Sequence, residues 1–128
     1  MSEPARSQLA FLIWAATPAH PELIATPLVH ALAGRALDAE VELHFAGPAV
    51  RWLVAGVAAA AYPAAGSDKS IAAFIAEAQQ AGVRCYLCSM AAAQWIAADE
   101  TLLAGVRHAG ATAFVARSLD PAWKTQVF

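Results

Sequence analysis

The sequence predicts an α/β fold in which one parallel sheet carries helices on both faces. Apolar runs of strand length alternate with amphipathic segments of helix length along the chain, as in folds built from strand–helix–strand units. The first run, residues 8–16 (QLAFLIWAA), is continuously apolar, which is typical of a strand buried on both faces. No internal repeat or low-complexity linker divides the 128 residues, so we expect a single domain over residues 1–128.

The elements of the first half follow from breaks and periodicity. Residues 17–21 (TPAHP) end the first strand, and small or apolar side chains recur at helical spacing over residues 22–37. Within that helix, Pro27 is expected either to kink the chain or to lie in the first turn. Residues 41–46 (VELHFA) predict the second strand, which Gly47-Pro48 ends before a helix that opens near Ala49. Residues 57–67 give no clear assignment.

The second half begins with capping side chains. Residues 67–70 (SDKS) precede an amphipathic helix that ends at Gly82, a residue type that commonly closes a helix in the left-handed conformation. Residues 83–88 predict the third strand, and residues 90–97 and 102–108 predict two short helical stretches. Residues 111–116 (ATAFVA) predict a fourth strand.

Charged side chains are scarce in this chain. They form 14% of the residues, against about 25% in most soluble domains. Because so few charges cover a small surface poorly, we expect a homo-oligomer. A net charge of −2 without a Lys/Arg cluster gives no reason to expect nucleic acid. The longest uncharged stretch, residues 52–67, is shorter than the roughly 20 apolar residues of a membrane span, so we expect no membrane association.

The cysteine content and the N-terminus indicate the compartment. Two cysteines are too few for a disulfide framework. Residues 1–6 lack a basic region that leads into an apolar signal core. We therefore expect a cytoplasmic protein.

Cys88 is the main candidate for chemistry. In a parallel sheet the carboxyl ends of the strands share one edge, where ligands bind, and Cys88 ends the third strand there. Unpaired N–H groups at the start of the following helix, near Ser89 and Met90, favour a thiolate, which is the nucleophilic form. The alternative is an inert cysteine in the core, since free cysteines are often buried. Both interpretations stay open at this point.

Cys85 and Cys88 together form a Cys-x-x-Cys motif. In an extended strand, three residues separate the α-carbons by about 10 Å, beyond the roughly 7 Å limit of a disulfide. Alternation along the strand also turns the two side chains to opposite faces. We therefore expect Cys85 in the core.

The remaining candidates are weaker. His20 follows the first strand and would lower the thiol pKa as a cation if it faced Cys88. Gly47 and Arg117 are expected at the same edge, as parts of segments 47–48 and 117–118. The histidines show no metal-ligand spacing, so we expect no metal, and His30 and His44 are interpreted as structural or surface groups.

The chain resembles the DsrE/DsrF-like family, which includes TusD-type sulfur-relay subunits and proteins described as predicted peroxiredoxins. The likeness is clearest over residues 71–119, with the segment GVRCYLCSM at 82–90, LLAGV at 102–106 and GATAF at 110–114, and it includes VELHFAGP at 41–48. It implies a Rossmann-like domain that assembles into trimers or hexamers. We expect no cofactor. The resemblance also implies that Cys88, and not Cys85, carries sulfane sulfur as a persulfide. No motif of the redox-relay members matches residues 57–67.

Three functions follow as hypotheses. The first is a sulfur-relay protein in which Cys88 takes sulfur from a donor persulfide and passes it to an acceptor thiol. The partners would be donor and acceptor proteins or low-molecular-weight thiols, and His20 or Arg117 would assist electrostatically. The second is a non-catalytic oligomeric binding module of the same fold. The third is a thiol redox protein that uses Cys85 and Cys88.

Overall fold

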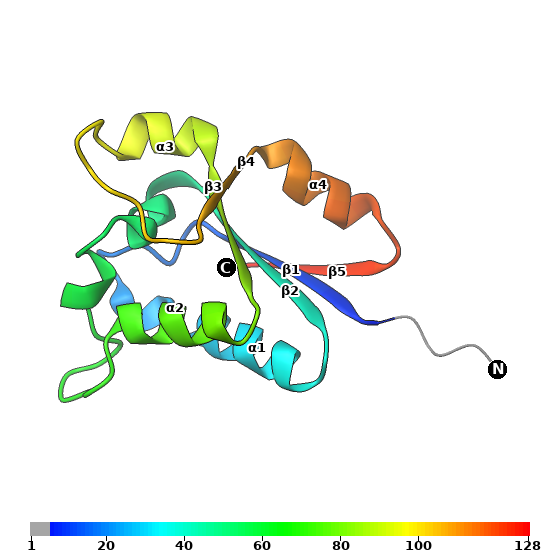
Figure 1. Cartoon of the computed structure of the whole chain (residues 1–128), viewed down its shortest axis with the longest axis horizontal. Coiled ribbons are helices and arrows are strands. Elements are labelled where there is room, and N and C mark those ends of the chain that lie inside the picture. The colour runs from blue at the N-terminus through cyan, green and yellow to red at the C-terminus, as the bar shows by residue number, and fades with distance from the viewer. Residues whose placement is uncertain (1–5) are drawn as a thin grey trace.

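A five-stranded parallel sheet forms the centre of the protein (Figure 1). The computed structural model describes residues 6–128, so most of the N-terminal segment in which no signal was expected lies outside the described residues. Neighbouring strands all pair in parallel, in the order β4-β3-β2-β1-β5. The strands are β1 (Gln8–Ile13), β2 (Glu40–Phe45), β3 (Arg84–Cys88), β4 (Arg107–Ala109) and β5 (Trp123–Val127).

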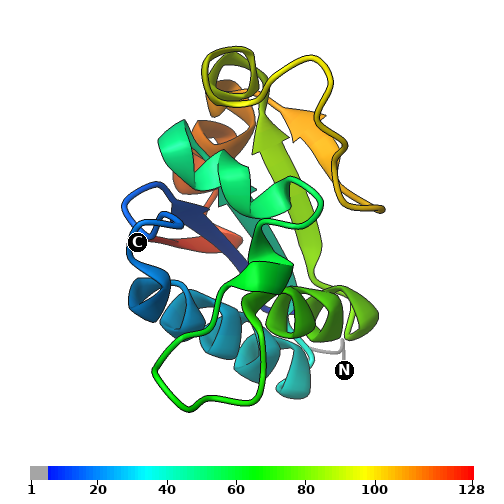
Figure 2. The ribbon, with the colours of Figure 1, turned by 90° about the vertical axis from the view of Figure 1, so that its left-hand side faces the viewer.

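Helices cover both faces of this sheet, which confirms the predicted α/β class. Two of them, α1 (Ala25–Ala36) and α2 (Ile71–Gln80), lie side by side on one face (Figures 1 and 2). The helix α4 (Ala111–Leu119) covers the opposite face, and α3 (Ser89–Trp95) follows β3 directly. Short 3₁₀ helices complete the chain: η1 (Pro21–Leu23), η2 (Gly47–Leu53) and η3 (Ala58–Ala60).

Side-chain alternation divides the interior into two unequal parts. Leu43, Phe45, Cys85 and Leu87 face α1 and α2 and belong to the main apolar core. The face toward α4 holds a small cluster of Ala10, Phe114 and Trp123, and the polar residues Glu42 and His44 are buried on the same side. The face toward α4 therefore holds buried polar side chains, which the main core lacks.

Several local predictions are confirmed. The amide of Ala73 donates to Ser70 Oγ at 3.2 Å, which caps α2, and Gly82 follows that helix with φ +101°. Pro27 lies in the first turn of α1, where its missing N–H costs no intrahelical hydrogen bond. The predicted first and third strands correspond to β1, which ends earlier at Ile13, and to β3. The helix expected near Ala49 is the 3₁₀ helix η2.

The prediction for residues 102–108 was wrong. Leu102 forms an isolated bridge with Val54, and Arg107–Ala109 is the edge strand β4, paired with β3. Gly105 adopts φ +80°, a conformation that interrupts a right-handed helix. Pairing with distant segments therefore decides the structure of residues 102–108, although their apolar run suggested a helix.

The prediction for residues 111–116 was also wrong, because this segment lies in the helix α4. A short apolar run does not distinguish a strand from a helix by periodicity. Of this helix, only Phe114 is buried, and Arg117 follows it by three residues on the same face. The fifth strand, β5, was not predicted.

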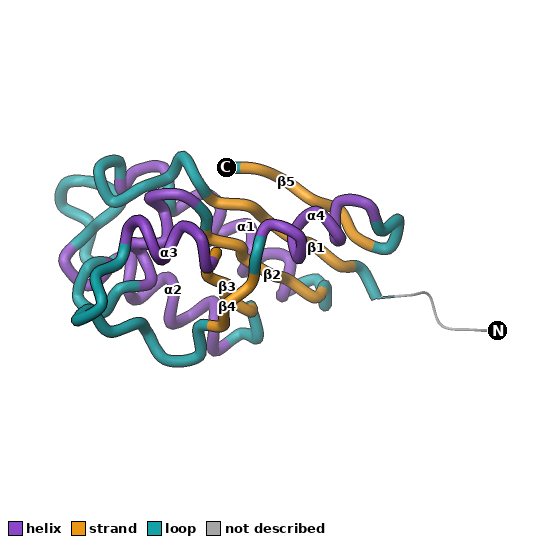
Figure 3. Tube along the Cα trace, turned by 90° about the horizontal axis from the view of Figure 1, so that it is seen from above, coloured by secondary structure: helices purple, strands orange, loops and turns teal. Residues whose placement is uncertain are grey.

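The loops that follow β1, β2 and β3 gather at one end of the molecule together with α3 (Figure 3). This end is the carboxyl edge of the sheet, where parallel α/β folds bind ligands. Among residues 6–128, none of the helices has both the length and the apolar character that a membrane span needs.

Candidate functional site

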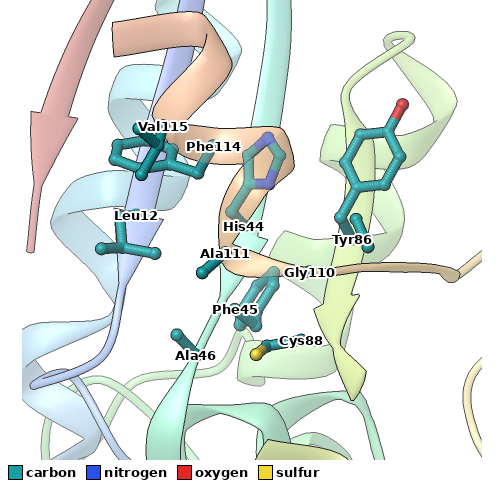
Figure 4. A pocket seen from close by; sticks show the side chains of 11 residues that line it. Leu12, His44, Phe45, Ala46, Tyr86, Cys88, Gly110, Ala111, Phe114 and Val115 are labelled. Carbon is teal, nitrogen blue, oxygen red and sulfur yellow. The ribbon is translucent and has the colours of Figure 1, made fainter. Parts of the chain in front are cut away.

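A cavity of about 160 Å³ opens at the carboxyl edge, between the sheet and the start of α4 (Figure 4). Its walls come from β1, β2, β3 and the segment that leads into α4, and they are largely apolar. The lining residues are Leu12, His44, Phe45, Ala46, Tyr86, Cys88, Ala109, Gly110, Ala111, Phe114 and Val115. A concave, largely apolar site with few polar groups is the usual form of a small-molecule pocket.

Cys88 presents a half-buried thiol to this cavity. It is the last residue of β3 and the N-cap of α3, and its backbone is still extended, with φ −66° and ψ 118°. Cys85 is only 1% exposed and lies in the main core, where burial raises the pKa of its thiol to about 12. Only one of the two cysteines is therefore placed for chemistry at the cavity.

The start of α4 forms one wall of the cavity. Gly110 is its N-cap and supplies no side-chain hydrogen bond, and both Gly110 and Ala111 line the cavity. Unpaired N–H groups at a helix start carry partial positive charge. The cavity is thus electrostatically suited to an anionic sulfur next to Cys88.

A buried ionic cluster lies beside the cavity and is centred on Glu42. The Glu42 side chain is 1% exposed and receives two hydrogen bonds from Arg117, at 3.0 and 2.9 Å. Arg84 Nη2 lies 3.2 Å from the same carboxylate, and His44 Nε2 lies 3.0 Å from Oε1. Burial would raise the pKa of Glu42, but the hydrogen bonds from His44 and Arg117 lower it to about 2. Glu42 is therefore ionised at neutral pH.

Aromatic contacts fix the ring of His44 in this cluster. It stacks on Tyr86 with a centroid distance of 5.0 Å and an interplanar angle of 18°. Phe114 of α4 meets the same ring edge-on at 5.5 Å. His44 is 6% exposed, so the interpretation of this residue as a simple surface or structural group misses its place in the cavity wall.

Comparison with known proteins decides the family. The model of the DsrE/DsrF-like family matches residues 9–124. The chain belongs to the DsrE/DsrF-like family. The predicted resemblance is thereby confirmed for nearly the whole sequence.

Solved structures share the fold of this DsrE/DsrF-like protein. The YchN protein from E. coli is 17% identical with a TM-score of 0.74, and the match covers 97% of this chain and 100% of that one. MTH1491, a protein of unknown function from Methanobacterium thermoautotrophicum, is 18% identical with a TM-score of 0.63, covering 95% and 99%. At these identities the likeness concerns the fold. None of the curated proteins matches the chain.

The predicted binding residues of this DsrE/DsrF-like protein are only partly brought together. Ser89 and Met90 begin α3 directly after Cys88, but their side chains do not line the cavity. Ser89 Oγ lies 3.4 Å from His108 Nδ1, and Met90 is 70% exposed. Gly47, with φ +53°, follows Ala46 of the cavity wall and lies at the predicted edge. None of these three residues lines the cavity itself.

His20 and Arg117 differ from the predicted arrangement. His20 is exposed and does not line the cavity. Its Nδ1 lies 3.3 Å from Glu22 Oε1. Arg117 does not follow a strand, because its segment is helical. Its guanidinium pairs with Glu42 and lies 4.0 Å above the ring of Trp123. Arg117 therefore belongs to the ionic cluster around Glu42 and is not part of the cavity wall.

One signal in the amino-acid pattern points to the missed residues. Glu42 and His44 alternate within a run that is otherwise apolar, so they share one face of a buried strand. Buried charge of this kind requires partners. Within residues 6–128, no group of three or more His, Cys, Asp or Glu side chains is arranged to hold a metal ion.

Proposed function

We propose that this DsrE/DsrF-like protein carries sulfane sulfur as a persulfide on Cys88 and passes it to an acceptor thiol. The observation that carries the proposal is the contrast between the two cysteines. Cys88 opens into a cavity at the carboxyl edge, whereas Cys85 is enclosed in the core. A persulfide carrier needs one accessible thiol at a site that shields its sulfur from water.

The transfer is a displacement at sulfur. The Cys88 thiolate attacks the outer sulfur of a donor persulfide, R–S–SH, and the S–S bond of the donor breaks. Cys88 then carries –S–SH, and the donor leaves as R–SH after it takes up the proton that Cys88 lost. The same exchange in reverse order delivers the sulfur to an acceptor. Backbone N–H groups at the start of α4, and those that follow Cys88, stabilise the anionic sulfur.

The partners in this proposal are thiols. The donor and acceptor are proteins or low-molecular-weight thiols, and the carrier works as a homo-oligomer, a trimer or hexamer, in the cytoplasm. The low share of charged residues, 14%, supports association with further copies. No cofactor takes part in the displacement.

Peptide mapping after loading with a persulfide donor tests the proposal. We expect one extra sulfur on the peptide that contains Cys88, retained in Cys85→Ser and lost in Cys88→Ser. Sulfur on neither thiol, or on Cys85 alone, would refute persulfide carriage by Cys88. A binding module of the same fold would instead keep its ligand in Cys88→Ser.

The redox alternative has less support. A disulfide between Cys85 and Cys88 requires both sulfurs on one side of the strand, but they face different layers of the fold. An intramolecular disulfide after mild oxidation would favour it over sulfur transfer.

A further inference from the structure

The cavity beside Cys88 is larger than a single persulfide needs. Its volume of about 160 Å³ is close to that of engineered apolar cavities of about 150 Å³, which hold a benzene molecule. A persulfide on Cys88 adds only one sulfur atom to this space. The relay described above therefore accounts for a small part of the cavity.

The walls of the cavity are unsuited to the charged parts of an organic thiol. They consist largely of apolar side chains. Of the polar side chains in the wall, His44 directs Nε2 to Glu42 Oε1 at 3.0 Å, and Figure 4 shows the Tyr86 hydroxyl turned away from the Cys88 sulfur. Burying a carboxylate or an ammonium group against apolar walls costs its hydration. The cavity therefore disfavours the organic part of a charged donor.

A chain of sulfur atoms suits the same walls. A sulfur atom bonded to two others has no hydrogen to donate and accepts hydrogen bonds only weakly, so it needs no polar partner. Consecutive S–S bonds are about 2.05 Å long, so two added atoms extend about 4 Å beyond the cysteine sulfur. Figure 4 shows the Cys88 sulfur at one end of the cavity and Phe114 and Val115 at the other. A chain that grows from the thiol therefore extends into the cavity.

We propose that the cavity allows Cys88 to hold more than one sulfane sulfur, as a short chain Cys88–S–S–SH. This inference rests on the proposed function and adds a storage capacity to the same site. After the first transfer, the Cys88 persulfide loses its proton and attacks the outer sulfur of a second R–S–SH. The S–S bond of that donor breaks, and R–S⁻ takes up the proton that the persulfide lost. The products are Cys88–S–S–SH and R–SH, and no oxidant or reductant is consumed.

The free end of the chain meets the same electrostatics as a persulfide. Gly110 and Ala111 at the start of α4 line the cavity, and N–H groups at a helix start carry partial positive charge. These groups stabilise an anionic terminal sulfur. Because the cavity opens at the carboxyl edge, an acceptor thiolate reaches that end and removes the sulfur atoms one at a time.

Mass spectrometry of Cys88 at rising ratios of donor to protein tests the inference. With excess glutathione persulfide, followed by capping with iodoacetamide, we expect Cys88 peptides with one and with two extra sulfur atoms. Ala46→Leu and Ala111→Leu enlarge side chains of the cavity wall and should lower the ratio of the two-sulfur to the one-sulfur form by about tenfold. The matched control is Ala93→Leu, at an exposed position of α3 outside the wall, which should leave this ratio unchanged.

The unmodified protein alone already decides the capacity, whether or not the variants fold. A Cys88 peptide with at most one extra sulfur at every donor ratio would overturn the inference and leave persulfide carriage intact. Equal ratios in the folded Leu variants and the unmodified protein would place the chain outside the cavity and overturn it as well. Loss of the first sulfur in both variants would mean that the cavity takes the organic group of the donor, which also contradicts the inference. Sulfur on neither cysteine refutes the carrier itself.

Discussion

Replacing Glu42 by Gln is expected to remove a part of the stability that depends on pH. The pKa of Glu42 is lowered from 4.5 to about 2, and its side chain is almost fully buried. A shift of this size corresponds to about 3 kcal/mol of extra stability in the ionised form. Because the folded pKa is depressed, this contribution is complete above pH 4.5 and is lost as the pH falls toward 2.

The measurement is the free energy of unfolding in urea at several pH values between 7 and 2. Protonated Glu42 and the glutamine side chain that replaces it are both neutral and of similar size, so the two proteins should converge in acid. We expect Glu42→Gln to be less stable by about 3 kcal/mol at neutral pH and nearly equal to the unmodified protein below about pH 2.

The difference between the two proteins isolates Glu42 from other carboxylates. The pKa of Glu100 is also lowered, to about 2, by hydrogen bonds from Arg51 and the Ala97 amide, but Glu100 is present in both proteins. The control is Glu77→Gln, a half-exposed residue paired with Lys69, which should cost less than about 1 kcal/mol. If the difference in unfolding free energy between Glu42→Gln and the unmodified protein stays constant from pH 7 to 2, the lowered pKa of Glu42 is contradicted.

Two further predictions concern the core. In the native state at pH 8, iodoacetamide should modify Cys88 and leave Cys85 unmodified, because burial raises the pKa of Cys85 to about 12; equal labelling would place Cys85 at the surface. Trp52 is fully buried and its Nε1–H donates to the Ala16 carbonyl at 2.6 Å. Trp52→Phe leaves that carbonyl unpaired and should lower the free energy of unfolding by about 1–3 kcal/mol in a denaturant titration.

The central strands were predictable because burial on both faces imposes a visible pattern. Strands β1 and β3 appear in the sequence as apolar runs between breaks, and α2 has a capping serine and a closing glycine. The strand β5 (WKTQV) lacks this pattern, since it is an edge strand that pairs only with β1. The pairing of such a strand depends on contacts far apart in the sequence.

The candidate site also has one part that the sequence predicts and one part that depends on distant contacts. The place of Cys88 follows from topology, because any residue that ends a parallel strand lies at the carboxyl edge. The place of His44 in the cavity wall depends instead on contacts that only the fold brings together. Arg117, which holds Glu42, is 75 residues away in the sequence and follows directly on the segment that was predicted as a strand. An error in one element thus concealed the buried acid beside the cavity.

The helix α4 connects the two parts of the site. Its N-cap Gly110 and its first residue Ala111 form part of the cavity wall that Cys88 also lines, and Phe114 packs on the His44 ring one turn later. Arg117 follows at the same helical spacing and pairs with Glu42. A strand in this position would place alternate residues on opposite faces and could not make all three contacts. Because residues 111–119 form a helix, one element contacts the cavity that Cys88 lines, the His44 ring and the Glu42 carboxylate.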